Sequence, residues 1–221
     1  MARLRDGQFV WVTWLSKVIS GEVKCEWAPW FRTRYQDWTK PPSDFQSTQW
    51  QIEHTQALSE LVAQRSGLGE SVWKEDQNRF RVKMTPTLTL SGKPDLVAMN
   101  QKGELTVYDV KTGKPRQSDM VQVMLYMLCL PTGLAIHKGK VFSGCIVYKD
   151  GDNSQIPPQA ISEDFKKNAR YFINLLDRAT PPRRTPSTQE CQYCDISGLD
   201  CSERLEATSG GQLPEAPLLD W

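Results

Sequence analysis

Two acidic residues stand near the ends of neighbouring strand-like segments in the stretch GKPDLVAMNQKGELTVYDVKTGKP, residues 92–115. Asp95 directly follows a proline, and Asp109 is followed two residues later by Lys111. Side chains alternate across a strand, so Asp109 and Lys111 are predicted to point to the same face. If the two segments pair as a hairpin, the two carboxylates converge, and such a pair suits a hard divalent cation such as Mg²⁺ or Mn²⁺.

A lysine beside two metal-binding carboxylates would complete a hydrolytic site. Its ammonium group can orient or activate a water molecule, or stabilise negative charge on a phosphate. The set of Asp95, Asp109 and Lys111 therefore points to metal-assisted hydrolysis of a phosphodiester bond. The structural alternative is that these charges simply lie in water at exposed strand ends, because an unpaired ion inside a strand costs desolvation energy.

The next segment, QSDMVQVMLYMLCL at residues 117–130, predicts an apolar helix with Ser118 as its N-cap. Gln122 and Tyr126 lie four residues apart and therefore share one face of this helix. A glutamine buried in so apolar a helix needs a hydrogen-bonding partner, whereas a glutamine on the solvent side does not. The sequence leaves both placements of Gln122 open.

Four of the six cysteines are not placed like ordinary buried thiols. Cys129 and Cys145 lie in apolar segments, where a free cysteine packs as a small hydrophobic side chain. The remaining ones comprise a C-x-x-C pair with a third cysteine close behind, next to a proline-rich linker, and one cysteine far upstream: Cys191, Cys194, Cys201 and Cys25. Four thiolates suit either Zn²⁺ or an iron–sulfur cluster, and the residues do not choose between them. A redox pair is the weaker alternative, because no thioredoxin-like context surrounds the C-x-x-C.

Composition bounds the class of protein. The chain has 221 residues, a mass of 25.2 kDa and a net charge of +1, and 39% of its residues are hydrophobic. These values fit one globular domain with a small appendage and exclude a strongly basic overall field, so nucleic-acid binding would depend on local patches. No apolar run reaches the roughly 18 residues of a membrane span, and the N-terminal segment lacks the layout of a signal peptide. We therefore expect a cytoplasmic protein without membrane partners.

Basic side chains flank the chemical motifs. Lys114 and Arg116 follow the acidic segments, and Arg183 and Arg184 precede the cysteine group. Basic and aromatic residues also interleave upstream, at Trp30, Phe31, Arg32, Arg34, Tyr35 and Trp38. Such a mixture suits a single DNA strand, because cations follow phosphates and rings stack on bases. The alternative is that the aromatic residues pack the N-terminal region.

The elements that must position these residues follow from the periodicity of the sequence. Helices are expected at 13–20, 48–65, 117–130 and 162–178. Strands are expected at 79–90, 93–99, 104–111 and 140–149. This order predicts an α/β fold in which helices flank a mixed central sheet.

The segments GKPDLVA, LTVYDVKTG and MVQVMLYML resemble the PD-(D/E)XK nucleases of the RecB-like type. The resemblance implies a restriction-endonuclease-like core and a metal-dependent deoxyribonuclease. It also implies a role for each motif residue: Asp95 and Asp109 would bind the metal, Lys111 would serve catalysis, and Gln122 and Tyr126 would support it from the following helix.

The same resemblance adds two metal ligands. One is a histidine from an upstream helix, which matches His54 in QIEHTQAL, and the other is the backbone carbonyl of Val110. For His54 alone an ordinary structural role would be the simpler interpretation, and the presence of the other motifs reverses it. The second histidine, His137, lies in the loop AIHKGK and is expected to be exposed.

One cysteine before this core and three after it resemble the CRISPR-associated exonuclease family. That resemblance implies an iron–sulfur cluster, usually 4Fe-4S, held by Cys25, Cys191, Cys194 and Cys201. It further implies trimming of single-stranded or unwinding DNA ends, with the integrase proteins of CRISPR adaptation as partners. A stand-alone or phage-type RecB-like nuclease of recombination or repair would share this chemistry. A non-catalytic DNA-binding scaffold with a structural zinc is the alternative from another class.

The resemblance also divides the chain. Residues 1–47 and 181–205 are expected to form a small cysteine-cluster subdomain built from both termini. Residues 48–180 are expected to form the nuclease core. Residues 206–221, which are rich in glycine and proline, are expected to be a loose tail.

Overall fold

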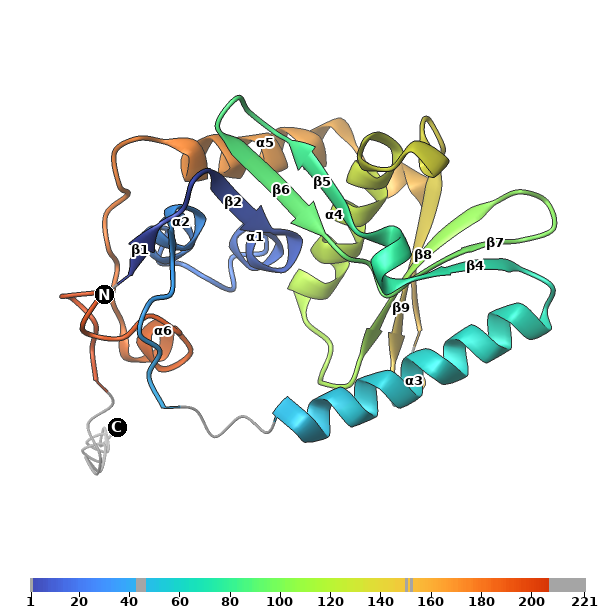
Figure 1. The fold of residues 1–221 in the computed structure, drawn as a ribbon, viewed down its shortest axis with the longest axis horizontal. Coiled ribbons are helices and arrows are strands. Elements are labelled where there is room, and N and C mark those ends of the chain that lie inside the picture. Colours follow the sequence, from blue (N-terminus) through green and yellow to red (C-terminus); the bar gives the residue numbers. More distant parts are fainter. Residues whose placement is uncertain (1, 43–46, 150, 152, 207–221) are drawn as a thin grey trace, which may run out of the picture.

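A computed structural model describes residues 2–42, 47–149, 151 and 153–206 of the chain. Helices lie on both sides of a twisted central sheet (Figure 1). The helices are α1 (Val12–Ile19), α2 (Trp27–Arg34), α3 (Ser47–Gly67), α4 (Gln117–Gly133), α5 (Glu163–Asp177) and α6 (Thr188–Gln192). Short 3-10 turns occur at Glu75–Asn78, Ala135–His137 and Pro158–Ala160.

The central sheet has five strands in the order β10–β9–β8–β7–β4. These strands are β4 (Ser71–Lys74), β7 (Leu96–Met99), β8 (Leu105–Lys111), β9 (Phe142–Tyr148) and β10 (Ser154–Ile156). Strands β8 and β9 are parallel, and the other neighbours are antiparallel. A parallel pair needs a crossover connection, which α4 supplies. The expected α/β fold with a mixed central sheet is therefore confirmed.

The alternation of side chains along β8 separates two hydrophobic cores. Leu105 and Val107 belong to the core that includes α4, whereas Tyr108 and Val110 pack with leucines of α3. Asp109 is in phase with Val107 and therefore faces α4. This register brings the acidic side chain of the strand to the helix that carries Gln122.

Close packing sets the distance between α4 and the sheet. A Cβ atom at Gly144 of β9 would lie 2.5 Å from Cγ1 of Val123 and 2.8 Å from Sδ of Met127. The helix can approach the strand this closely because residue 144 has no side chain. The polar residues of α4 are thereby held within reach of the adjacent strand β8.

A second sheet has the order β2–β6–β5 and is built from Gln8–Trp11, Leu88–Gly92 and Phe80–Lys83. A short β1 (Arg3–Leu4) pairs with β3 (Tyr35–Gln36). Distant parts of the chain meet beside these strands, since the backbone N–H of Ala2 donates to Asp200 at 3.0 Å and the indole of Trp30 donates to the carbonyl of Arg178 at 2.8 Å. The division into a cysteine subdomain and a nuclease core stays a prediction.

Three expectations from the sequence are wrong. Ser118 is not the N-cap of α4, because the helix begins at Gln117 with Arg116 in the N-cap position. The segment 79–90 is not one strand: it forms β5 and β6, which pair with each other, and the turn between them contains Pro86. His137 is not exposed, since it is 2% accessible and its ring contacts Trp73 and Phe142 edge to face. The sequence analysis also did not anticipate α2, β2 or β4. Nearly all of the expected tail, residues 207–221, lies outside the described residues.

Candidate active site

Asp95 and Asp109 meet where β7 and β8 pair. Asp95 directly precedes β7, and the antiparallel register places Leu96 opposite Tyr108. The carboxylate Oδ2 of Asp95 accepts a hydrogen bond from the backbone N–H of Val110 at 2.8 Å. Both acids are buried, with exposures of 9% for Asp95 and 2% for Asp109. The expected hairpin therefore brings the two carboxylates to one place.

Lys111 and Gln122 surround the carboxylate of Asp109. The ammonium Nζ of Lys111 lies 2.7 Å from Oδ2 of Asp109 and donates to Oε1 of Gln122 at 3.1 Å. The amide Nε2 of Gln122 in turn donates to Oδ1 of Asp109 at 2.8 Å and to the Tyr126 hydroxyl at 3.1 Å. Gln122 is 7% exposed, so the solvent-facing alternative is wrong and the amide has the partners that burial requires.

His54 reaches the same place from α3. Its Nε2 lies 3.1 Å from Oδ2 of Asp95, although the two residues are 41 positions apart. The hydrogen bond to Asp95 raises the pKa of His54, while partial burial opposes the shift. The histidine, both acids and the lysine thus converge from α3, β7 and β8.

Burial dominates the electrostatics of the site. It raises the pKa of Asp109 to about 6, although the charge of Lys111 opposes the shift. Burial by itself would lower the pKa of Lys111, but the carboxylates of Asp109, Asp119 and Asp95 raise it overall. Lys111 is therefore a cation over the physiological pH range, held beside an acid that releases its proton reluctantly.

All the residues predicted for the metal and catalytic site line one cavity of about 570 Å³: His54, Asp95, Asp109, Val110, Lys111, Gln122 and Tyr126. Their donor set suits a hard divalent cation, because it combines carboxylate and carbonyl oxygens with one imidazole. Among the described residues, the buried Oδ2 of Asp109 is paired only with Nζ of Lys111, at 2.7 Å, so a cation bound here would share this oxygen with the lysine. As they stand, no three His, Cys, Asp or Glu side chains of the described segments are grouped closely enough to hold a metal ion.

Comparison with known proteins identifies the family of this chain. The sequence profile of the PD-(D/E)XK nuclease superfamily matches residues 12–199, which is most of the chain. The chain belongs to the PD-(D/E)XK nuclease superfamily. No curated protein matches it. Among solved structures, it is similar to a crystal structure of a protein named SSO0001, at 14% identity and a TM-score of 0.45, over 92% of this chain and 90% of that one.

Membership of the superfamily supports a nuclease that binds a divalent metal and acts on DNA. The motif that gives the superfamily its name matches Pro94–Asp95 and Asp109-x-Lys111 in this PD-(D/E)XK nuclease. Those residues are the ones that the hairpin between β7 and β8 brings together. The individual role of each residue stays a prediction.

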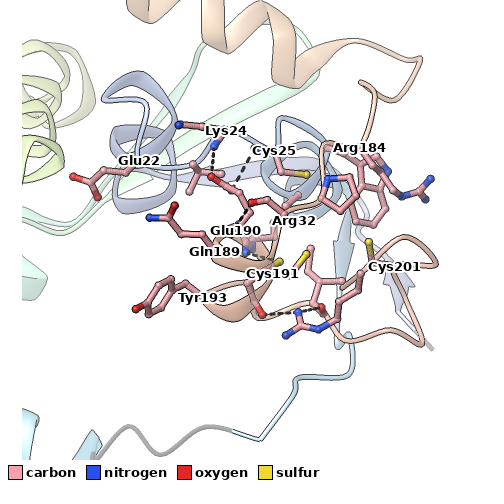
Figure 2. Close-up of a pocket in the computed structure, with 18 of the residues that line it drawn as sticks. Glu22, Lys24, Cys25, Arg32, Arg184, Gln189, Glu190, Cys191, Tyr193 and Cys201 are labelled. Atoms are coloured by element: carbon pink, nitrogen blue, oxygen red, sulfur yellow. Dashed lines mark hydrogen bonds between the residues drawn. The ribbon is translucent and has the colours of Figure 1, made fainter. Parts of the chain in front are cut away.

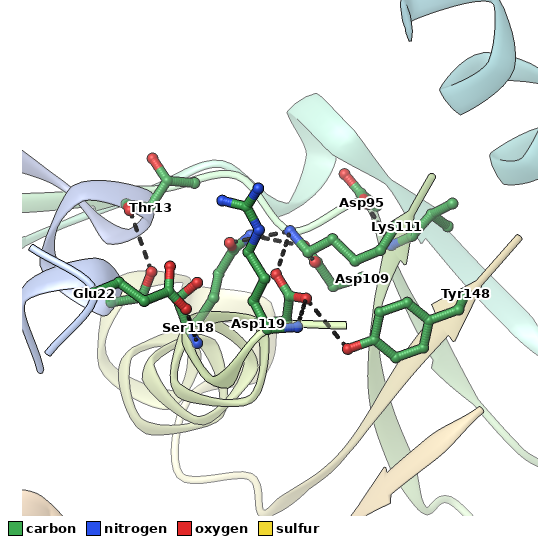
Figure 3. A network of polar contacts seen from close by, with 12 residues as sticks. Thr13, Glu22, Asp95, Asp109, Lys111, Ser118, Asp119 and Tyr148 are labelled. Carbon is green, nitrogen blue, oxygen red and sulfur yellow. Dashed lines mark hydrogen bonds and ion pairs between the residues drawn. The ribbon is translucent and has the colours of Figure 1, made fainter. Parts of the chain in front are cut away.

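Asp119 is a site residue that the sequence analysis missed. It is 7% exposed, and its Oδ1 lies 3.7 Å from Nζ of Lys111. Its Oδ2 accepts hydrogen bonds from the Tyr148 hydroxyl at 3.2 Å and from the backbone N–H of Arg116 at 3.0 Å (Figure 3). The sequence offered no capping signature for this contact, because arginine is not a typical N-cap residue, and the approach to Lys111 depends on the fold.

Four of the six cysteines of the nuclease line a second cavity of about 370 Å³ between α2 and α6 (Figure 2): Cys25, Cys191, Cys194 and Cys201. Two of the sulfurs face N–H groups: Sγ of Cys191 accepts from the backbone of Leu205 at 3.4 Å, and Sγ of Cys194 accepts from Arg32 at 3.8 Å. Donors aimed at sulfur are typical of thiolate sites. Cys129 and Cys145 lie elsewhere, buried as expected, at 3% and 2% exposure.

The basic and aromatic segment near residue 30 packs inside the nuclease. Trp30 and Phe31 are 7% and 6% exposed. Arg34 covers the Trp30 ring at 4.4 Å and donates to the backbone carbonyls of Leu176 and Arg178, while Arg32 bonds to Asp195. The alternative in which these aromatic residues pack the N-terminal region therefore describes the structure. Lys114 and Arg116, which follow the residues of the first cavity in sequence, remain exposed.

Proposed function

We propose that this nuclease hydrolyses phosphodiester bonds of DNA with Mg²⁺ or Mn²⁺ and acts as an exonuclease that trims single-stranded ends. The observation that carries the proposal is the convergence of Asp95, Asp109 and Lys111 in one cavity, with Lys111 and Asp109 held by Gln122. Lys111 is half-buried beside two buried carboxylates, and ionisable groups with shifted pKa values that cluster in one cavity are typical of functional sites.

In the proposed mechanism, Asp95, Asp109, His54 and the carbonyl of Val110 would hold the divalent cation. If bound there, the cation would polarise the scissile phosphate and lower the pKa of a bound water. Lys111 positions the water or stabilises charge on the phosphate. Gln122 keeps the ammonium group of Lys111 in place and donates to Asp109, and Tyr126 buttresses Gln122 through its hydroxyl.

We further propose that Cys25, Cys191, Cys194 and Cys201 hold an iron–sulfur cluster of the 4Fe-4S type. The support is that all four line one cavity and that N–H groups face two of the sulfurs. On this proposal the biological role is the trimming of DNA ends for CRISPR adaptation, with integrase proteins as partners. Visible absorbance and iron content of the purified protein test the cluster: a colourless protein that contains zinc would contradict it.

Cleavage of end-labelled single-stranded DNA with Mn²⁺, Mg²⁺ or EDTA tests the nuclease activity. Wild type should give metal-dependent products, and Lys111→Ala should lose them. The matched control is Lys102→Ala, since Lys102 is an exposed lysine in the turn between β7 and β8, at the end of the hairpin opposite to the two acids. It should keep most of the activity. An inert wild type, or equal cleavage by the Lys111 variant, would overturn the proposed function in favour of a non-catalytic DNA-binding scaffold.

A further inference from the structure

A large aromatic side chain stands at the mouth of the catalytic cavity. Trp50 lies in the first turns of α3, four residues before His54, and lines the same cavity as the two acids. Its ring packs against the imidazole of His54, with 5.2 Å between centroids and 28° between planes. The residue is nevertheless 43% exposed. Among the large hydrophobic side chains that are exposed in the described segments, Trp50 alone lines this cavity.

Trp50 lies beside the place where the scissile phosphate would bind. His54 touches Asp95 through Nε2, which is on the edge of its ring, so the indole stacked on that ring stands beside the proposed metal site. A phosphate at Asp95 and Lys111 would have the base of a flanking nucleotide within reach of the indole. Stacking between a base and an aromatic ring tolerates any sequence, because every base has a π face.

The charges of the cavity make such a contact useful. The carboxylates of Asp95, Asp109 and Glu75 face the ammonium groups of Lys93 and Lys111, and Lys93 is paired with Glu75 at 3.2 Å. The net charge of the whole chain is only +1. The carboxylates of the lining therefore weaken the attraction that its lysines exert on phosphates, and attraction of this kind supplies most of the affinity of many DNA-binding proteins. An uncharged contact with a base would compensate for it.

We propose that Trp50 forms a nucleobase-stacking subsite that receives an unpaired base next to the scissile phosphate. The inference rests on the proposed nuclease function and adds a preference for single strands, because a base in a duplex is already stacked and paired. Trp50 binds substrate in this account and takes no part in proton transfer.

Equilibrium binding of a fluorescent single-stranded oligonucleotide in EDTA tests the subsite without cleavage. Trp50→Ala should weaken binding by about 5-fold to about 150-fold, the range found for loss of one base–aromatic stack. The factor should be the same at low and high salt, because stacking releases no counterions. Trp50→Phe should keep most of the affinity. The control Tyr171→Ala removes a ring that is 53% exposed on α5, on the other side of the molecule (Figure 1), and should bind as wild type does.

A scan with one abasic nucleotide at each successive position locates the contact. At one position, the abasic nucleotide should weaken binding by wild type about as much as Trp50→Ala does. The same nucleotide should not weaken binding by Trp50→Ala any further. The subsite would be overturned if Trp50→Ala bound the oligonucleotide as tightly as wild type. It would also be overturned if the abasic nucleotide weakened binding by wild type and by the variant equally at every position. Metal-dependent cleavage by wild type is read separately, so failure of the nuclease function and failure of the subsite give different results.

Discussion

Replacement of Gln122 by leucine tests whether one buried amide holds the active site together. Leucine is close in volume to glutamine, so the change mainly removes hydrogen bonds. Gln122 is 7% exposed, accepts a bond from Lys111 and donates one to Asp109, and both partners are charged. Without Gln122, Oδ1 of the buried Asp109 loses this donor.

The expected magnitude follows from these contacts. A hydrogen bond to a charged group contributes about 1.5–3 kcal/mol, and bonds within one network are not additive. Lys111 stays 2.7 Å from Oδ2 of Asp109 in wild type, and this ion pair can persist in the variant. We therefore expect the free energy of unfolding to fall by about 2–4 kcal/mol. Metal-dependent cleavage should fall as well, because Lys111 is no longer held in one position.

Urea denaturation of the metal-free protein, followed by tryptophan fluorescence, measures the loss of stability. The matched control is Gln117→Leu, which makes the same substitution at the exposed first residue of the same helix. The control should change the free energy of unfolding by no more than about 0.5 kcal/mol. Equal losses in the two variants, or a Gln122 variant as stable as wild type, would refute the reasoning, because the buried network would then contribute nothing.

Other predictions concern the same site and the packing behind it. Burial raises the pKa of Asp109 from its ordinary 3.8 to about 6, so the folded state binds more protons than the unfolded state between these values. The metal-free protein should therefore lose at most about 3 kcal/mol of stability as the pH rises from about 4 to about 7, and urea titrations should find this loss absent in Asp109→Asn. Asp119→Asn keeps the size of the side chain but removes a charge 3.7 Å from Nζ of Lys111. It should lower kcat roughly 5- to 30-fold with little change in KM, and an unchanged kcat in single-strand cleavage would contradict the positioning role. Gly144→Ala should lower the free energy of unfolding by about 1–3 kcal/mol, because its Cβ would overlap α4. Gly67→Ala, where nothing lies within 4 Å, is the control, and equal thermal melting of the two variants would argue against tight packing at β9.

The local order of residues was enough to predict which acids and which lysine form the candidate active site. Asp95, Asp109 and Lys111 lie within 17 residues of sequence. Asp95 directly precedes one short strand, and the alternation of the next strand puts Asp109 and Lys111 on one face. The apolar run of α4 likewise predicts a buried helix in which a glutamine needs a partner. Such features depend on spacing along one or two elements, so the sequence predicts them without knowledge of the remaining chain.

Contacts between distant elements were decided by the tertiary structure. The placement of His54 against Asp95 depends on how α3 crosses the sheet, and the residues nearest in sequence carry no sign of it. Asp119 reaches Lys111 because α4 packs tightly on β9, and His137 is buried because β4 and β9 supply aromatic neighbours. Periodicity reports which face of an element is apolar, but it does not report which other element covers that face. The resemblance to a known family supplied His54, whereas Trp50 and Asp119 required the packed fold.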